Sequence, residues 1–374
     1  MKKLQSICIL RICAALTVFF LHTWIVTNNL AGINNTWDKL FFLKTPAWGG
    51  VWIFFVISGY LAGRGFILER YNLSMKSILH FYLDKLIKVG IPTLFFIFIL
   101  CVTVYPDFIP SNQGALTALL TFTYNGSPGL PGIGATWFVS TVMQLYLLTP
   151  GLYYLLKKLN ARLSGRTAHT AVLIGIIAAG CFYRVLLYKN QISWYSWVYT
   201  PSIANLDLFL AGFQMNYLLC QNKREGGNRI IGNPLLILLL LLLVTFNSYL
   251  YYFGETESGR QSFLFIYQYV MPSVYAAFIS IFLYFFMEKE QSHTENLFEK
   301  ILNWFDGISF WFYLWHSLIL DKIYPHIALS SPAAFHLKLL AVTFVITGIL
   351  ASFYTKAFNM LSKEFIKKQR LYNQ

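Results

Sequence analysis

Long apolar segments separated by short polar loops run through the whole chain. A helix needs about 20 such residues to cross a bilayer core of roughly 30 Å. The pattern predicts ten spans, near residues 5–26, 47–68, 89–105, 133–156, 169–188, 201–219, 233–253, 263–287, 303–324 and 336–358. The apolar segment Ala115–Tyr124 is too short to cross, so we expect an interfacial or re-entrant piece. The expected fold class is all-α, a polytopic integral membrane helical bundle, with residues 1–374 forming a single transmembrane domain.

Composition agrees with lipid as the surrounding solvent. The chain is 57% hydrophobic and 12% charged, with a mean hydropathy of +0.55, and so little charge cannot cover a water-exposed surface. A formal charge of +14 would suggest nucleic acid as a partner of a soluble protein. Here the basic residues lie in short loops between apolar segments, so membrane lipid is the expected surrounding and nucleic-acid binding is not expected.

The distribution of basic residues predicts the orientation. Lys and Arg gather in cytoplasmic loops of membrane proteins, and 21 of the 29 fall on the side of the N-terminus when ten spans are counted. The opposite side receives Lys39, Lys44, Arg184, Lys189, Arg260, Lys322 and Lys338. We therefore expect a multi-pass protein with both termini in the cytoplasm. The five cysteines are scattered and show no metal-ligand spacing, so no metal is expected.

The first span contains two ionisable residues, Arg11 and His22, eleven positions apart. Eleven residues at 100° each return to within about 20° of the same helix face, about 16 Å further along the axis. Ionisable groups within a span are costly unless they face a partner or a cavity, which indicates a functional pair. The alternative is that Arg11 extends to the cytoplasmic surface while His22 rests at the outer interface.

The second span and the segment after it offer further candidates. Ser58, Tyr60 and the neighbouring glycines of FFVISGYLAG are typical of close helix packing, and they are candidates for a substrate site as well. Lys85 and Lys88 share one helical face just before Pro92. They are either phosphate-binding residues or ordinary basic residues of a cytoplasmic loop.

Polar or amphipathic groups also lie in the fourth, sixth and ninth spans. Trp137 and Tyr146 belong to ATWFVSTVMQLYLLTP, and His316 to GISFWFYLWHSLIL. A single histidine in a span more often bonds two helices together than catalyses a reaction, and both roles stay open for His316. Asp207 and Asp321 are the remaining acidic candidates, for which a salt bridge or a helix cap is the simpler explanation.

Taken in order, five features resemble the acyltransferase-3 family of membrane acyltransferases. They are the Arg11–His22 spacing, the FFVISGYL segment, the basic pair before Pro92, the WFVSTVMQLYLLTP span and the FWFYLWHSLIL span. The resemblance implies transfer of an acyl group, commonly acetyl from cytoplasmic acetyl-CoA, to a sugar hydroxyl of a surface or envelope glycan. It also implies a bacterial-type plasma (inner) membrane.

The resemblance assigns roles to several of these residues. It implies that His22 is the catalytic base and that Arg11 is its partner and a contact of the acyl-CoA donor. Lys85 and Lys88 stand where the family usually has two arginines, which keeps the charge but loses the bidentate geometry of Arg on phosphate. Many relatives have a glutamate where this chain has Val142 and Met143.

Two mechanisms and one other function remain open from the sequence. His22 acts either as a general base toward the sugar hydroxyl or as a nucleophile that forms a transient acyl-histidine. The alternative function is a secondary transporter of a small anionic or sugar substrate, although the related halves common in transporters are not evident. The acyl group, the acceptor glycan and the oligomeric state are not indicated.

Overall fold

The computed structural model describes residues 5–31, 47–104, 136–224, 232–254, 260–286, 297–327 and 332–372. The regular structure in these ranges is entirely helical, which confirms the predicted all-α class. The α-helices are α1 (Gln5–Ala31), α2 (Ala47–Ile67), α3 (Met75–Lys85), α4 (Ile91–Thr103), α6 (Thr136–Asn160), α7 (Gly165–Lys189), α8 (Leu206–Arg224), α9 (Asn233–Gly254), α10 (Arg260–Phe265), α11 (Met271–Phe285), α12 (Leu297–Ile323) and α13 (Pro332–Tyr372).

Each of the ten predicted spans overlaps these helices, but not every helix has the hydropathy of a membrane span. In the described part of the chain, seven helical stretches have the length and hydropathy of a span. The helices α6, α8 and α12 are not among them, since their polar side chains lower the hydropathy. The number of ten spans therefore stays a prediction. The segment Ala115–Tyr124 lies outside the described residues.

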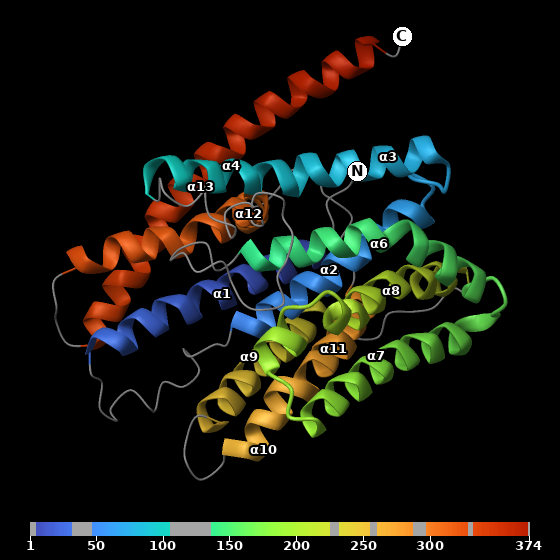
Figure 1. The fold of residues 1–374 in the computed structure, drawn as a ribbon, viewed down its shortest axis with the longest axis horizontal. Coiled ribbons are helices and arrows are strands. Elements are labelled where there is room, and N and C mark those ends of the chain that lie inside the picture. The colour runs from blue at the N-terminus through green and yellow to red at the C-terminus, as the bar shows by residue number, and fades with distance from the viewer. Residues whose placement is uncertain are drawn as a thin grey trace.

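The third predicted span begins much earlier than residue 89. The helix starts at Met75, passes through a π-helical turn at Leu86–Gly90 (η2) and continues as α4 to Thr103. Figure 1 shows α3 and α4 as one rod across the bundle. Pro92 has no N–H to donate to the preceding turn, and a wide turn is one way for a helix to accommodate that loss. The basic pair Lys85 and Lys88 thus lies inside a helix, at its irregular turn.

Other predicted boundaries also shift. The sixth span was expected from residue 201, but α8 begins at Leu206 because a 3₁₀ turn, η4 (Ile203–Asn205), precedes it. The last helix, α13, continues to Tyr372 instead of ending near 358, and Figure 1 shows it running out beyond the other helices. Arg184 was counted with a loop, yet it lies within α7 and is only 1% exposed.

The centre of the bundle is α2, which packs against α1, α8 and α11. Gly59 of α2 lies directly against the backbone of Phe209 on α8, and Gly212 of α8 lies against the backbone of Val56. A side chain at either glycine would meet a carbonyl oxygen, so the two helices approach as closely as backbones allow. The predicted packing role of the small residues near Ser58 is confirmed at Gly59.

Replacing Gly59 by Ala should destabilise the fold by about 1–3 kcal/mol, because the new Cβ would overlap the Phe209 carbonyl and force α2 and α8 apart. The measurement is the thermal midpoint of the detergent-purified protein. The matched control is Gly175→Ala on α7, an exposed helical position with open space around it, where the midpoint should stay or rise slightly. Equal midpoints for the two variants would contradict the close contact.

Candidate active site

Helices α1 and α12 lie side by side and are joined by polar contacts along their length, two of which involve residues predicted from the sequence. Arg11 Nη1 donates to Asp306 Oδ1 at 2.6 Å, and His22 Nδ1 lies 2.7 Å from His316 Nε2. The two α1 residues are eleven positions apart and the two α12 residues ten, so both helices advance by about 15–16 Å between the contacts. The helices are therefore parallel. The prediction that Arg11 and His22 share one helix face is confirmed, since both face α12.

The first contact pairs opposite charges. The Asp306 side chain is 6% exposed and that of Arg11 28%, so the carboxylate is buried and the guanidinium partly open. A buried carboxylate without a partner is strongly unfavourable, and the arginine supplies the compensating charge. Arg11 is thus bonded to Asp306 of α12. The alternative prediction was that Arg11 extends to the membrane surface.

The second contact joins two histidine rings edge to edge, nitrogen to nitrogen. The rings of His22 and His316 are 4.9 Å apart and nearly parallel, at 9°. His316 is 1% exposed, whereas His22 is only partly buried. The Nδ1 atom of His316 lies 2.6 Å from the Tyr313 carbonyl oxygen. Each ring nitrogen of His316 is therefore engaged, one with the backbone and one with His22.

A cavity of about 440 Å³ lies beside the first contact. It brings together Arg11, Ser58, Lys85, Lys88 and Tyr146, five of the residues predicted from sequence. The remaining lining residues are Phe54, Ile57, Leu61, Val89, Phe138, Val142, Asp306, Gly307, Ser309, Phe310 and Tyr313. Val142 makes its part of the wall apolar. The residues come from α1, α2, α3, η2, α6 and α12.

The histidine pair does not line this cavity, and neither do Tyr60 and Trp137. Arg11 and His22, predicted as a functional pair, therefore do not line the same cavity. Tyr313 contacts both regions: it lines the cavity, and its ring centroid lies 5.9 Å from that of His316. The Tyr313 ring also lies against Phe54 and Phe138, which line the cavity too. An aromatic side chain thus lies between the cavity and His316.

Two lysines bring positive charge to the other part of the cavity. Lys85 Nζ lies 4.5 Å from the centre of the Tyr146 ring and 5.4 Å from that of Phe81, a cation–π arrangement. Lys88 Nζ lies 2.8 Å from Asp84 Oδ1 and is 56% exposed. Both predicted cations therefore face the cavity, and the Lys88 charge is shared with a carboxylate.

Asp84 also anchors the turn before α3. The Tyr71 hydroxyl donates to Asp84 Oδ2 at 2.8 Å. Burial, together with this hydrogen bond and the nearby carboxylate charge, raises the pKa of the Tyr71 phenol above its ordinary value, so Tyr71 stays neutral and remains a donor. The contact ties the α2–α3 turn to the helix that presents both lysines.

The remaining predicted residues have packing positions. The Tyr60 hydroxyl accepts a hydrogen bond from Arg64 at 3.1 Å, and its carbonyl accepts one from Asn216 of α8 at 3.0 Å. Trp137 is 6% exposed, with its ring 4.6 Å from that of Tyr199. Ser58 and Tyr146, by contrast, both line the cavity.

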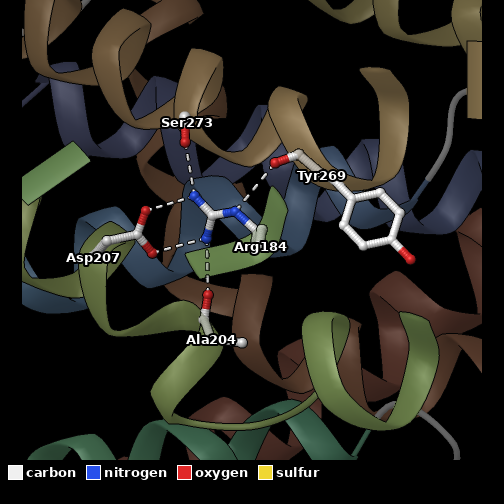
Figure 2. Close-up of polar contacts among 5 residues, drawn as sticks. All are labelled: Arg184, Ala204, Asp207, Tyr269 and Ser273. Carbon is white, nitrogen blue, oxygen red and sulfur yellow. Dashed lines mark hydrogen bonds and ion pairs between the residues drawn. The ribbon is translucent and has the colours of Figure 1, made fainter. Parts of the chain in front are cut away.

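Asp207 forms a buried ion pair with Arg184 (Figure 2). Arg184 donates to both Asp207 oxygens at 2.9 and 2.7 Å, to the Ala204 carbonyl at 2.9 Å, to the Ser273 hydroxyl at 2.7 Å and to the Tyr269 carbonyl at 3.3 Å. All five guanidinium donors are thus satisfied. The expected salt bridge of Asp207 is confirmed, and its saturated geometry indicates a structural contact between α7, α8 and α11.

A second buried polar cluster links α6, α7 and α8. The side-chain amides of Asn160 and Gln214 exchange hydrogen bonds of 2.9 and 2.8 Å, and His169 Nδ1 lies 2.7 Å from Asn160 Oδ1. Like the Arg184 pair, it lies away from the cavity and holds helices together. Among the described residues, no group of three or more His, Cys, Asp or Glu side chains is placed to hold a metal ion.

Sequence reasoning missed two residues of the site, Asp306 and Tyr313. The available signal was an acidic residue ten positions before a histidine in an apolar helix, which matches the eleven-residue spacing of Arg11 and His22. Tyr313 gave no comparable signal, because aromatic residues are abundant in every span.

The described helices and this polar face inside the bundle define a multi-pass helical membrane protein with charged and basic groups around an internal cavity. A family model described as an acyltransferase domain matches residues 4–355. The chain therefore belongs to the acyltransferase-3 family of membrane acyltransferases. Searches of curated proteins and of solved structures returned no match.

Removal of the buried guanidinium by Arg184→Met should cost about 3–5 kcal/mol of stability, because Asp207 would be left charged and unpaired in the protein interior. Thermal denaturation in detergent measures the effect, and a fall in the yield of folded protein is expected with it. Arg162→Met is the matched control, since Arg162 is exposed in the turn between α6 and α7. If both variants melted at the same temperature, the ion pair would not be a structural contact.

Proposed function

We propose that this protein transfers an acyl group, most simply acetyl, from cytoplasmic acyl-CoA to a hydroxyl group of an envelope or surface glycan. Membership of the acyltransferase-3 family supports acyl transfer. The observation that carries the proposal further is the cavity that joins the basic turn at Lys85 and Lys88 to the Arg11–Asp306 pair. The cavity combines positively charged and apolar lining residues within one protein-walled space.

The donor binds with its phosphates at the lysines. The Lys85 ammonium lies over aromatic rings, which leaves its charge available to an anion. Lys88 is more than half exposed and is positioned by Asp84. Lysine contacts phosphate as a point charge, so these residues supply attraction with less geometric selection than a pair of arginines.

The acyl arm then occupies the cavity. A volume of about 440 Å³ lies within the usual range for small-molecule sites, about 300–1,000 Å³. Apolar residues such as Ile57, Leu61 and Val142 suit a pantetheine chain, and Arg11 lies on the wall as a hydrogen-bond donor. Tyr313 lies between the cavity and His316, so the thioester can reach His22 only if this side chain moves.

The chemical step follows from the accessible imidazole. Neutral His22 takes the proton of the sugar hydroxyl while the hydroxyl oxygen attacks the thioester carbonyl carbon. The tetrahedral intermediate collapses as the carbon–sulfur bond breaks, and the CoA thiolate leaves. The proton held by His22 passes to the departing sulfur, so the histidine returns to its neutral form. The products are the acylated glycan and free CoA.

The proposed orientation places both termini in the cytoplasm of a bacterial-type inner membrane. The parallel direction of α1 and α12 supports termini on the same side, because the first and ninth of ten alternating spans cross a membrane in the same direction. The excess of Lys and Arg on that side favours the cytoplasm. The lysine turn of η2 then lies toward the cytoplasm, where acyl-CoA is available, while His22 lies further outward along α1.

Lys85→Ala and Lys88→Ala should each weaken acetyl-CoA binding about tenfold, the loss expected for one charge-assisted contact of about 1.5 kcal/mol. The measurement is the thermal shift that acetyl-CoA produces in detergent-purified protein, since a ligand of the folded state raises its midpoint. Lys76→Ala is the control: Lys76 is exposed at the start of the same helix, away from the cavity. Unchanged titration curves for both cavity variants would place the donor elsewhere.

His22→Ala should lower acyl transfer by about 10²–10⁴-fold, the usual contribution of a general base, while the thermal shift with acetyl-CoA persists. Mass spectrometry of envelope glycans from cells with the wild-type chain, the variant and no chain measures the transfer and identifies the acyl group by its mass. His326→Ala, at an exposed histidine after α12, is the control. A folded His22→Ala variant that still acylates the glycan would remove this histidine from the chemistry.

A further inference from the structure

The hydrogen bonds around His316 determine where its proton lies. His316 Nδ1 is 2.6 Å from the Tyr313 carbonyl oxygen. A carbonyl oxygen only accepts hydrogen bonds, so Nδ1 must carry the proton. In a neutral imidazole the other nitrogen is then bare. His316 therefore presents the lone pair of Nε2 to its neighbour.

The neighbour is His22, and the same donor–acceptor argument assigns the proton of its ring. The 2.7 Å contact joins His316 Nε2 to His22 Nδ1. Since His316 Nε2 is the acceptor, His22 Nδ1 must be the donor and carries the proton. His22 Nε2 is left with its lone pair. A backbone carbonyl of α12 thus sets the tautomer of a histidine on α1 through one intervening ring.

We propose that His316 is a positioning residue that holds His22 in the Nδ1–H tautomer and thereby makes His22 Nε2 the atom that receives the hydroxyl proton. This inference rests on the proposed function of His22 as the base. It assigns a specific nitrogen and a second histidine to that chemistry. The same nitrogen is the nucleophile if the reaction passes through an acyl-histidine.

The two histidines differ in burial, which assigns the positioning role to His316 and the role of base to His22. His316 is 1% exposed and enclosed by Phe19 and Tyr313, so it cannot itself reach a substrate. His22 is the more accessible ring of the pair. When Nε2 of His22 takes a proton, its Nδ1–H remains bonded to His316 Nε2, and the ring keeps its orientation through the reaction. The 9° angle between the rings agrees with one fixed arrangement.

The direct test is the tautomer of His22 in the full-length protein, measured by NMR of ¹³C,¹⁵N-histidine-labelled protein in lipid bilayers. The His22 signal is identified by its loss in His22→Ala. We expect the Nδ1–H form in the resting protein. A resting Nε2–H form would overturn the proposal, whatever the level of activity.

Two variants test the consequence for catalysis. His316→Phe keeps a ring but removes the acceptor, and it should lower kcat about 10- to 100-fold, as loss of a histidine's orienting partner commonly does, with the KM for acetyl-CoA unchanged. His316→Gln places an amide oxygen near the former Nε2 and should recover most of the loss. The control is His326→Phe, at an exposed position.

The outcomes distinguish this inference from the proposed function. If His22→Ala abolishes transfer but His316→Phe retains the wild-type kcat and tautomer, the positioning role is wrong while the base remains. If His22→Ala retains transfer, the proposed base is wrong, and the NMR result still decides the tautomer. If His316→Phe does not fold, His316→Gln and the wild-type NMR spectrum test the proposal instead. A folded His316→Gln variant whose kcat stays far below that of the wild type would overturn the positioning role.

Discussion

The pairing of α1 with α12 through the Arg11–Asp306 and His22–His316 contacts is the constraint on which the site depends. In an apolar bundle neither an arginine nor a buried aspartate is tolerated without a partner, and Arg11 with Asp306 satisfies that condition. The histidine contact repeats the pairing about 15 Å further along the same two helices. With two contacts at matched spacing, the helices can neither slide nor rotate against each other without breaking both. The relative position of cavity and histidines is therefore set by the pair of helices that carries them.

Contacts between the other helices stabilise this arrangement. The glycine contact between α2 and α8 lets two backbones touch, so α2 can present Ser58 and Phe54 to the cavity from its other side. The Arg184–Asp207 pair joins α7 to α8, and the Asn160–Gln214 amides join α6 to α8, by buried hydrogen bonds. These clusters are saturated with partners, which is typical of structural contacts. The cavity differs because its lysines face open space.

Charged and apolar side chains share the wall of the cavity. Arg11 and the two lysines supply positive charge, while Val142 and Tyr313 contribute apolar and aromatic surface. Two phenylalanine rings pack against Tyr313 and add to this apolar character. Electrostatic interactions are stronger beside apolar protein than in water, so these positive charges attract an anionic ligand more strongly here than they would in solution.

Hydrophobic periodicity determined the helical class, the places of the helices and the shared face of Arg11 and His22, because these depend only on residues close together along the chain. It misjudged the start at Met75 and the burial of Arg184, since a π turn and a tertiary ion pair override local hydropathy. The partners Asp306 and His316 lie almost 300 positions from the residues they contact. Only packing of α12 against α1 decided that Asp306 compensates Arg11, that His316 holds His22, and that Tyr313 stands between the cavity and the histidines. Such contacts arise from the arrangement of whole helices, which no single segment encodes.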